Sequence, residues 1–118
     1  MEYTGLETYS RALAFMNQNV SQKLTVKDIA FHCNVSTSGL EKVFSKYYGA
    51  GVMAYFRELK LEEAKKMLKS GYTVFAIAQT LQYSSSAHFS AAFKKKYGIS
   101  PLKYKHEKRL KAQKERKL

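Results

Sequence analysis

One stretch of this chain occurs twice, and the repeat limits the folds open to it. The pattern Thr-Val-x-x-Ile-Ala that begins at Thr25 returns 48 residues later at Thr73, and Ser36 recurs as Ser84 at the same offset. Further along the offset is 49: Leu40, Phe44, Lys46, Tyr48, Gly49 and Tyr55 recur as Phe89, Phe93, Lys95, Tyr97, Gly98 and Tyr104. The second copy therefore carries one extra residue, near the turn or at the start of its second helix. Each copy reads as a short helix, a turn, a longer helix and a glycine, which predicts two helix-turn-helix units.

Helical periodicity dominates the whole chain. Apolar residues recur three or four positions apart, and no segment alternates apolar and polar residues for long enough to form a strand. We predict an all-α fold of about seven helices, in which two helix-turn-helix subdomains are joined by a long linking helix. The predicted helices cover roughly 7–19, 26–33, a segment capped by Ser36 or Thr37, 52–69, 74–81, 85–97 and a last helix from Pro101. The corresponding divisions are 1–51 and 71–105 for the subdomains, 52–70 for the linking helix and 106–118 for a basic C-terminal tail.

The charge of the chain points to a polyanionic partner. Lysine and arginine number 21 against nine aspartates and glutamates, which gives a formal net charge of +12. Residues 103–118 carry +6 of this charge, so the remaining chain is also basic. Nucleic acid is the usual partner of so small and basic a chain, and the alternatives are a solubility effect or an anionic membrane surface.

Other features of the sequence indicate the cellular compartment of the protein. No apolar run approaches the ~20 residues that span a membrane, and the N-terminus lacks the basic start and apolar block of a secretory signal. Cys33 is the only cysteine, so an intrachain disulfide is excluded. These features predict a reducing cytoplasm.

The length of the linking helix suits two successive major grooves. Its 18 residues span about 27 Å at ~1.5 Å per residue. With the flanking turns, this length is compatible with second helices about 34 Å apart, which is one turn of B-DNA. We therefore expect one chain to read two groove segments as a monomer.

The landmarks of the repeat resemble the DNA-binding domain of the AraC/XylS transcription regulators. The resemblance covers about 24–105 and is most specific from Ile77-Ala78 to Tyr104. It rests on Ile29-Ala30, Ser36, Leu40, Phe44, Gly49, Leu61-Glu62, Ala64, Leu68, Ile77-Ala78, His88-Phe89-Ser90, Phe93, Tyr97-Gly98, Ser100-Pro101 and Tyr104. Membership implies seven helices, two helix-turn-helix subdomains and control of bacterial transcription, usually activation. Many members also carry an effector-binding or dimerising domain, so the chain is either a stand-alone short regulator or part of a longer one.

Four positions depart from the family pattern. The family usually has glycine in each turn, where this chain has Asn34 and Gln82, and a positive φ would strain the glutamine. Tyr83 replaces the usual phenylalanine. Lys60 stands where arginine is common before Leu61, which keeps the charge and loses the bidentate fork.

The apolar stripe of each second helix defines an opposite face that can meet DNA. The resemblance implies base-reading positions that map onto Thr37, Ser38, Glu41 and Lys42 in the first copy and onto Ser86, Ala87, His88 and Ala91 in the second. Lys42 can donate to guanine, and Glu41 either accepts from cytosine or is an ordinary solvated carboxylate. The alanines can only contact a thymine methyl group, and His88 either makes one polar contact or packs at the helix start. We therefore expect weaker base discrimination from the second copy and more reliance on DNA shape.

Phosphate contacts are expected beside these positions and at helix N-termini. The candidates are Thr25, Ser45, Lys46, Thr73, Lys94 and Lys95. Residues beyond Lys105 read as a frayed, solvated helix that adds non-specific affinity.

Other function classes are less well supported. No nucleophile elbow or glycine-rich phosphate loop occurs, and His32-Cys33 lacks further ligands at metal spacing. We therefore expect no enzyme activity, no cofactor and no metal. The alternatives to sequence-specific transcription regulation on double-stranded DNA are a non-specific nucleic-acid binder and a module that recruits RNA polymerase.

Overall fold

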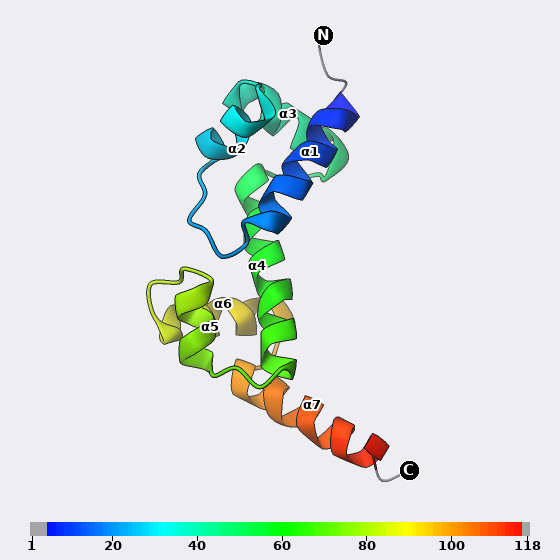
Figure 1. Ribbon diagram of the computed structural model, residues 1–118, viewed down its shortest axis with the longest axis vertical. Coiled ribbons are helices and arrows are strands. Elements are labelled where there is room, and N and C mark those ends of the chain that lie inside the picture. Colours follow the sequence, from blue (N-terminus) through cyan, green and yellow to red (C-terminus); the bar gives the residue numbers. More distant parts are fainter. Residues whose placement is uncertain (1–4, 117–118) are drawn as a thin grey trace. The chain divides into compact units, whose positions relative to one another are not determined.

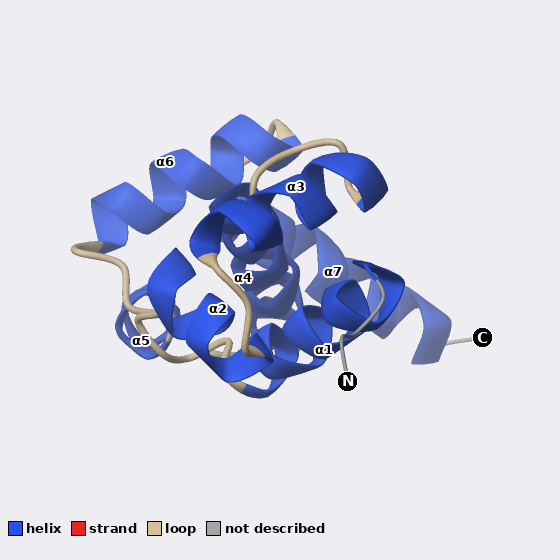
Figure 2. Ribbon diagram, turned by 90° about the horizontal axis from the view of Figure 1, so that it is seen from above, coloured by secondary structure: helices blue, strands red, loops and turns tan. Residues whose placement is uncertain are grey.

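The computed structural model describes residues 5–116, and every regular element among them is a helix (Figure 1, Figure 2). The helices are α1 (Gly5–Gln18), α2 (Val26–Cys33), α3 (Thr37–Tyr47), α4 (Val52–Lys69), α5 (Val74–Thr80), α6 (Ser86–Tyr97) and α7 (Pro101–Arg116). The predicted all-α class with seven helices is therefore confirmed. The bounds of α2 and α4 agree with the prediction residue for residue.

The chain forms two compact units that divide between Lys60 and Leu61, inside α4. Unit 1 contains α1, α2, α3 and the first half of α4, and unit 2 contains the second half of α4 with α5, α6 and α7. Each unit therefore holds one copy of the repeat and draws part of its structure from α4.

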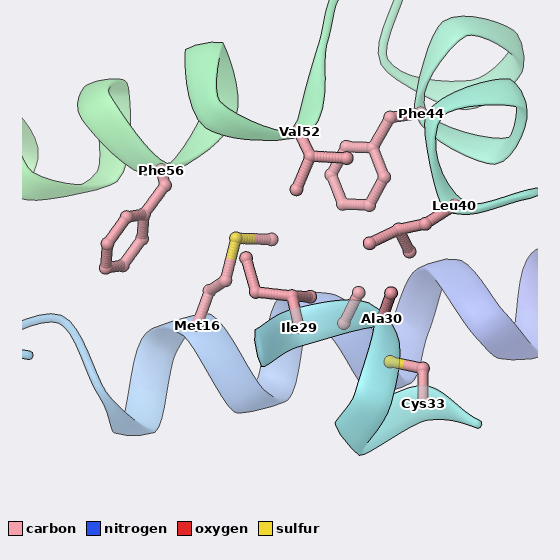
Figure 3. Packing of buried hydrophobic residues seen from close by; sticks show 9 residues of the cluster. Met16, Ile29, Ala30, Cys33, Leu40, Phe44, Val52 and Phe56 are labelled. Carbon is pink, nitrogen blue, oxygen red and sulfur yellow. The ribbon is translucent and has the colours of Figure 1, made fainter. Parts of the chain in front are cut away.

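The core of unit 1 is a cluster of aliphatic, aromatic and sulfur-containing side chains from four helices (Figure 3). Ala12 and Met16 of α1 pack with residues of α2 and α3 and with Val52 and Phe56 of α4. The α2 and α3 members are Ile29, Ala30, Cys33, Leu40 and Phe44, all at most 3% exposed. This packing holds α3 in place by its apolar face and leaves the opposite face to solvent.

The core of unit 2 uses the equivalent positions of the second copy. Ile77, Phe89 and Phe93 are fully buried, and Leu68 of α4 is buried with them in the same unit. Tyr104 of α7 lies edge-on to Phe93, with ring centroids 5.6 Å apart. The two copies of the repeat therefore bury residues at equivalent positions in their cores.

The turns show where the extra residue of the second copy lies. Asn34 and Gln82 both have left-handed backbone, with φ of 57° and 64°. The next helix is capped by Ser36 in the first copy but by Ser85 in the second, whose hydroxyl accepts from His88 N at 3.0 Å. Ser84 is therefore the inserted residue and lies in the turn, so the counterpart of Ser36 in the structure is Ser85.

The packed face of the first helix differs from the apolar stripe that its periodicity predicts, which is Leu6, Tyr9, Leu13, Met16 and Val20. The buried positions are Thr8, Ala12 and Met16, while Leu6 is 56% exposed. Small side chains at Thr8 and Ala12 allow closer packing than the leucine and tyrosine beside them, and this turns the helix relative to the expectation. The last helix continues to Arg116 with its final residues exposed, as expected for a solvated helical tail.

Candidate DNA-binding surface

The exposed face of α3 carries the first-copy candidates other than Thr25. Thr37, Ser38, Glu41, Lys42, Ser45 and Lys46 are exposed. Leu40 and Phe44 hold the opposite face in the core, so the apolar stripe predicted the outward face correctly. Lys46 lies with its Nζ 5.2 Å from the centroid of the Tyr47 ring. The polar and basic groups of this face are therefore open to a partner.

Glu41 makes a contact that the sequence did not indicate. Its Oε1 accepts a hydrogen bond from Val52 N at 3.3 Å. Val52 is the first residue of α4, where backbone amides lack partners within the helix and a carboxylate is favoured. The carboxylate therefore helps to cap α4, a role other than the two considered from the sequence.

The exposed face of α6 is poorer in hydrogen-bonding groups. Ala87, His88 and Ala91 are exposed, and Ser86 is half-buried. The His88 Nδ1 lies 3.0 Å from the Ser84 hydroxyl, and the imidazole is edge-on to Tyr83 at 5.5 Å between centroids. The inserted serine and the tyrosine in the turn thus orient an imidazole that remains accessible.

Correct alignment of the second copy adds one position to this face. With Ser85 as the counterpart of Ser36, the counterpart of Glu41 is Ser90, which is half-buried. The sequence prediction left this serine out, although the offset of 49 between Leu40 and Phe89 already pairs Glu41 with Ser90.

The predicted phosphate contacts differ in their surroundings. Thr25 forms a reciprocal capping box with Asp28, whose carboxylate accepts from Thr25 N at 2.8 Å. These hydrogen bonds from Thr25 lower the pKa of the Asp28 carboxyl, so an anion already occupies the start of α2. Thr73 caps α5 through Ala76 N at 3.1 Å, with no acidic residue in its first turn.

Basic side chains extend the accessible surface of unit 2. Lys94 and Lys95 are exposed in the last turn of α6. On α7, Lys105 donates to the carbonyl oxygens of Gly71 and Tyr72 at 3.2 and 3.1 Å, which anchors the start of α7 to the α4–α5 turn. The basic residues from Lys108 to Arg116 therefore lie on a helix that is anchored near its start.

The described residues show neither a membrane segment nor a metal site. No helix among residues 5–116 is both long and apolar enough to cross a bilayer. Among these residues, no group of three or more histidine, cysteine, aspartate or glutamate side chains is placed to hold a metal ion. Cys33 is fully buried, and burial raises the pKa of its thiol.

Comparison with known proteins identifies the family. A helix-turn-helix domain model matches residues 29–107. The transcriptional regulator ArgR of Pseudomonas aeruginosa is 31% identical over 101 residues, which are 85% of this chain and 31% of ArgR. The transcriptional activator AarP of Providencia stuartii is 32% identical over 97 residues, which are 81% of this chain and 72% of AarP.

A solved structure supports the same assignment. The crystal structure of an AraC-type DNA-binding-domain regulator from Chromobacterium violaceum superposes with a TM-score of 0.84 at 27% identity, and the match covers 87% of this chain and 93% of that one. With the domain match over most of the chain and the duplicated helix-turn-helix fold, these similarities show that the chain belongs to the AraC/XylS family of helix-turn-helix DNA-binding domains.

Proposed function

We propose that this chain binds double-stranded DNA at specific sequences and regulates transcription, with α3 and α6 as the recognition helices in successive major grooves. The observation that carries this proposal is the duplicated geometry. In both units the second helix of the motif is held by buried apolar residues and presents its other face to solvent. A helix presented in this way fits the major groove.

The two recognition helices have unequal roles in this proposal. Lys42 reads guanine, while Thr37 and Ser38 supply lesser polar contacts. On α6, His88 makes a polar contact beside Ser86, and Ala87 and Ala91 meet thymine methyl groups. Glu41 remains a candidate for base reading, although its bond to Val52 N favours a role in placing α3 against α4.

Backbone contacts complete the proposed interface. Ser45, Lys46, Lys94 and Lys95 contact phosphates, as do the helix starts at Thr25 and Thr73. The resident Asp28 carboxylate makes Thr25 the weaker of the two starts. The proposed contacts lie in the subdomains 1–51 and 71–105, while 52–70 is the linking helix and 106–118 is the basic tail.

The direction of regulation, the location and the oligomeric state are proposed from the family. AarP is a transcriptional activator, and we propose activation for this chain as well. The chain would act at the nucleoid in the bacterial cytoplasm, bind DNA as a monomer, and require neither catalysis nor a cofactor. ArgR is about three times as long as the matched region, so the match does not cover most of ArgR.

Selection from a random duplex library over a salt series tests the proposal. We expect a selected site with two preferred blocks about one helical turn apart. Lys42→Ala should relax the preference at one position by ~1–3 kcal/mol. The matched control is Lys66→Ala, because Lys66 lies on α4 with a side chain that is 76% exposed. Affinity that falls steeply with salt without any selected sequence would contradict the proposal and favour a non-specific nucleic-acid binder.

Recruitment of RNA polymerase is a second candidate, favoured by one exposed aromatic residue. Phe31 is 90% exposed on α2 and borders a groove also lined by Phe15, Leu24 and His32. Phe15 and His32 stack with centroids 4.0 Å apart, which gives this groove a fixed apolar wall. Phe31→Ala should then reduce transcription activation in vitro while leaving DNA affinity unchanged. Equal activation by this variant and the wild type would exclude this surface.

A further inference from the structure

The repeat reproduces a cluster of three aromatic residues at the end of each recognition helix. In the first copy the cluster is Phe44, Tyr48 and Tyr55, and in the second it is Phe93, Tyr97 and Tyr104. Each residue of the first cluster has its counterpart 49 positions later. Phe44 meets Tyr55 edge-on at 5.9 Å between centroids, and Phe93 meets Tyr104 in the same way at 5.6 Å. Both recognition helices therefore end in an equivalent aromatic environment.

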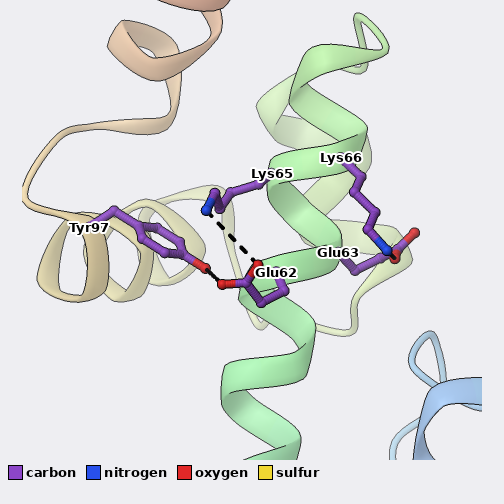
Figure 4. A network of polar contacts seen from close by, with 5 residues as sticks. All are labelled: Glu62, Glu63, Lys65, Lys66 and Tyr97. Atoms are coloured by element: carbon purple, nitrogen blue, oxygen red, sulfur yellow. Dashed lines mark hydrogen bonds and ion pairs between the residues drawn. The ribbon is translucent and has the colours of Figure 1, made fainter.

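Each of these clusters places one tyrosine hydroxyl against a glutamate of α4. In unit 1, the Tyr48 hydroxyl donates to the Glu58 carboxylate. In unit 2, the Tyr97 hydroxyl donates to Glu62 Oε1 at 2.9 Å (Figure 4). Hydrogen bonds from a neutral hydroxyl to an ionised carboxylate are stronger than bonds between neutral groups.

The second of these bonds does not follow from the repeat. The offset of 49 makes Glu107 on α7 the counterpart of Glu58. Tyr97 instead uses Glu62, which lies on α4 four residues after Glu58. Residues four apart lie one helical turn from each other on the same side of a helix. The linking helix thus supplies the acceptor for both copies.

A lysine strengthens the contact in unit 2. Lys65 Nζ lies 3.9 Å from Glu62 Oε2 and 4.6 Å from the centroid of the Tyr97 ring (Figure 4). The carboxylate therefore contacts the hydroxyl on one side and the ammonium group on the other, while the ammonium group covers the aromatic face. These contacts join the last turn of α6 to α4.

We propose that the Tyr48–Glu58 and Tyr97–Glu62 pairs are positioning pairs, which fix the orientation of each recognition helix on α4 and so set the spacing between the two DNA blocks that the chain accepts. The inference rests on the proposed function. A hydrogen bond depends on angle as well as distance, so each pair adds a directional constraint at the helix end to the packing of the apolar core. Because both acceptors lie on one continuous helix, loosening either pair should widen the range of accepted spacings.

The test uses Tyr48→Phe and Tyr97→Phe, which retain the rings and remove the hydroxyls. Each variant is titrated with the selected duplex and with duplexes that have one base pair added or removed between the two blocks. For the wild type, we expect about a tenfold loss of affinity on changing the spacing. For each variant, this loss should shrink at least ~threefold, with little change on the selected duplex. Glu62→Gln, whose amide oxygen can still accept, should retain most of the spacing preference, and Tyr72→Phe is the control for an exposed hydroxyl in unit 2.

Amide hydrogen exchange separates failure of this inference from failure of the proposed function. Tyr97→Phe should accelerate exchange at Lys96 and Tyr97 at least ~threefold and leave α5 unchanged, whether or not any DNA sequence is preferred. Unchanged exchange in α6 would overturn the anchoring role by itself. Equal losses of affinity on all spacings would also overturn the inference, because they would indicate a general loss of stability. A wild type without sequence preference would overturn the proposed function and the spacing role together, while the exchange result still decides the anchor.

Discussion

Asn34 and Gln82 lie in equivalent turns and share a left-handed backbone conformation that asparagine tolerates better than glutamine. Asn34 and Gln82 both have positive φ, and glutamine lacks the short side chain that lets asparagine tolerate this region. Gln82→Gly should therefore raise the free energy of unfolding by about 0.5–1 kcal/mol, as measured by urea denaturation. Asn34→Gly is the matched control and should change stability less. A loss of stability in Gln82→Gly would show that the glutamine side chain contributes more than the strain costs.

Lys60 is a second residue whose surroundings affect stability. It is half-buried on α4, where its ammonium group donates to Gln22 O at 3.3 Å and lies 4.9 Å from the Phe56 ring centroid. Burial lowers the pKa of Lys60 from 10.5 to about 8. Between these values the unfolded chain binds more protons than the folded one, so the Lys60 contribution to stability increases as pH rises from about 8 to 10.5.

Two substitutions isolate this contribution. Lys60→Arg remains charged throughout the window, and Lys60→Met is neutral throughout, so both should lack the gain that the wild type shows. Lys60→Met should also be more stable than the wild type at pH 7 by about 1 kcal/mol, because it avoids burying a charge. Denaturant unfolding at several pH values measures both effects. Parallel profiles for the wild type and Lys60→Arg would contradict the lowered pKa.

At the scale of helices, the two copies provide matched N-terminal caps. Thr25 and Thr73 each accept from the amide three residues on, and either substitution by alanine should cost about 1 kcal/mol of stability. Only the first cap includes an acidic partner, because Asp28 occupies the position equivalent to Ala76.

The acidic partner makes the first cap dependent on pH. Its hydrogen bonds with Thr25 lower the pKa of Asp28 from 3.8, so its contribution is present above that value and is lost as pH falls through the lower folded-state pKa. Asp28→Asn should therefore destabilise the protein at pH 7 and approach the wild type in acid. Thermal melts at pH 7 and pH 3 would reveal this convergence. The cost of Thr73→Ala should remain constant over the same range.

The helices differ in how far neighbouring residues in the sequence predict their bounds and their packed faces. Capping residues and glycine stops predicted α2 and α4, and the apolar stripes predicted the exposed faces of α3 and α6. The packed face of α1 was misplaced because its direction depends on how closely α2 and α3 approach it. The contacts Glu41–Val52 and Tyr97–Glu62 join residues distant in sequence, and no local pattern specifies them.

Most of the basic residues of the molecule lie on the recognition helices α3 and α6, on α4 and on α7. Lys105 has a structural role at the start of α7, since it binds the carbonyl groups of Gly71 and Tyr72. Among the described residues that follow, Lys108 lies over the Tyr104 ring at 5.4 Å, whereas Arg109, Lys111, Lys114 and Arg116 are exposed. Their charge is therefore available to phosphates without sequence preference.

Removal of the residues after Lys105 should separate affinity from specificity. Each lost phosphate contact lowers the slope of log affinity against log salt by ~0.9, so the truncated chain should bind DNA more weakly and with a shallower slope. Its selected sequence should remain that of the full chain, because α3 and α6 keep their cores and Lys105 still holds the α4–α5 turn. Lys42→Ala should show the converse pattern, with altered sequence preference and a nearly unchanged slope. If truncation erased the sequence preference while the melting temperature stayed the same, α7 itself would take part in recognition, and the division of labour between the helices and the tail would be wrong.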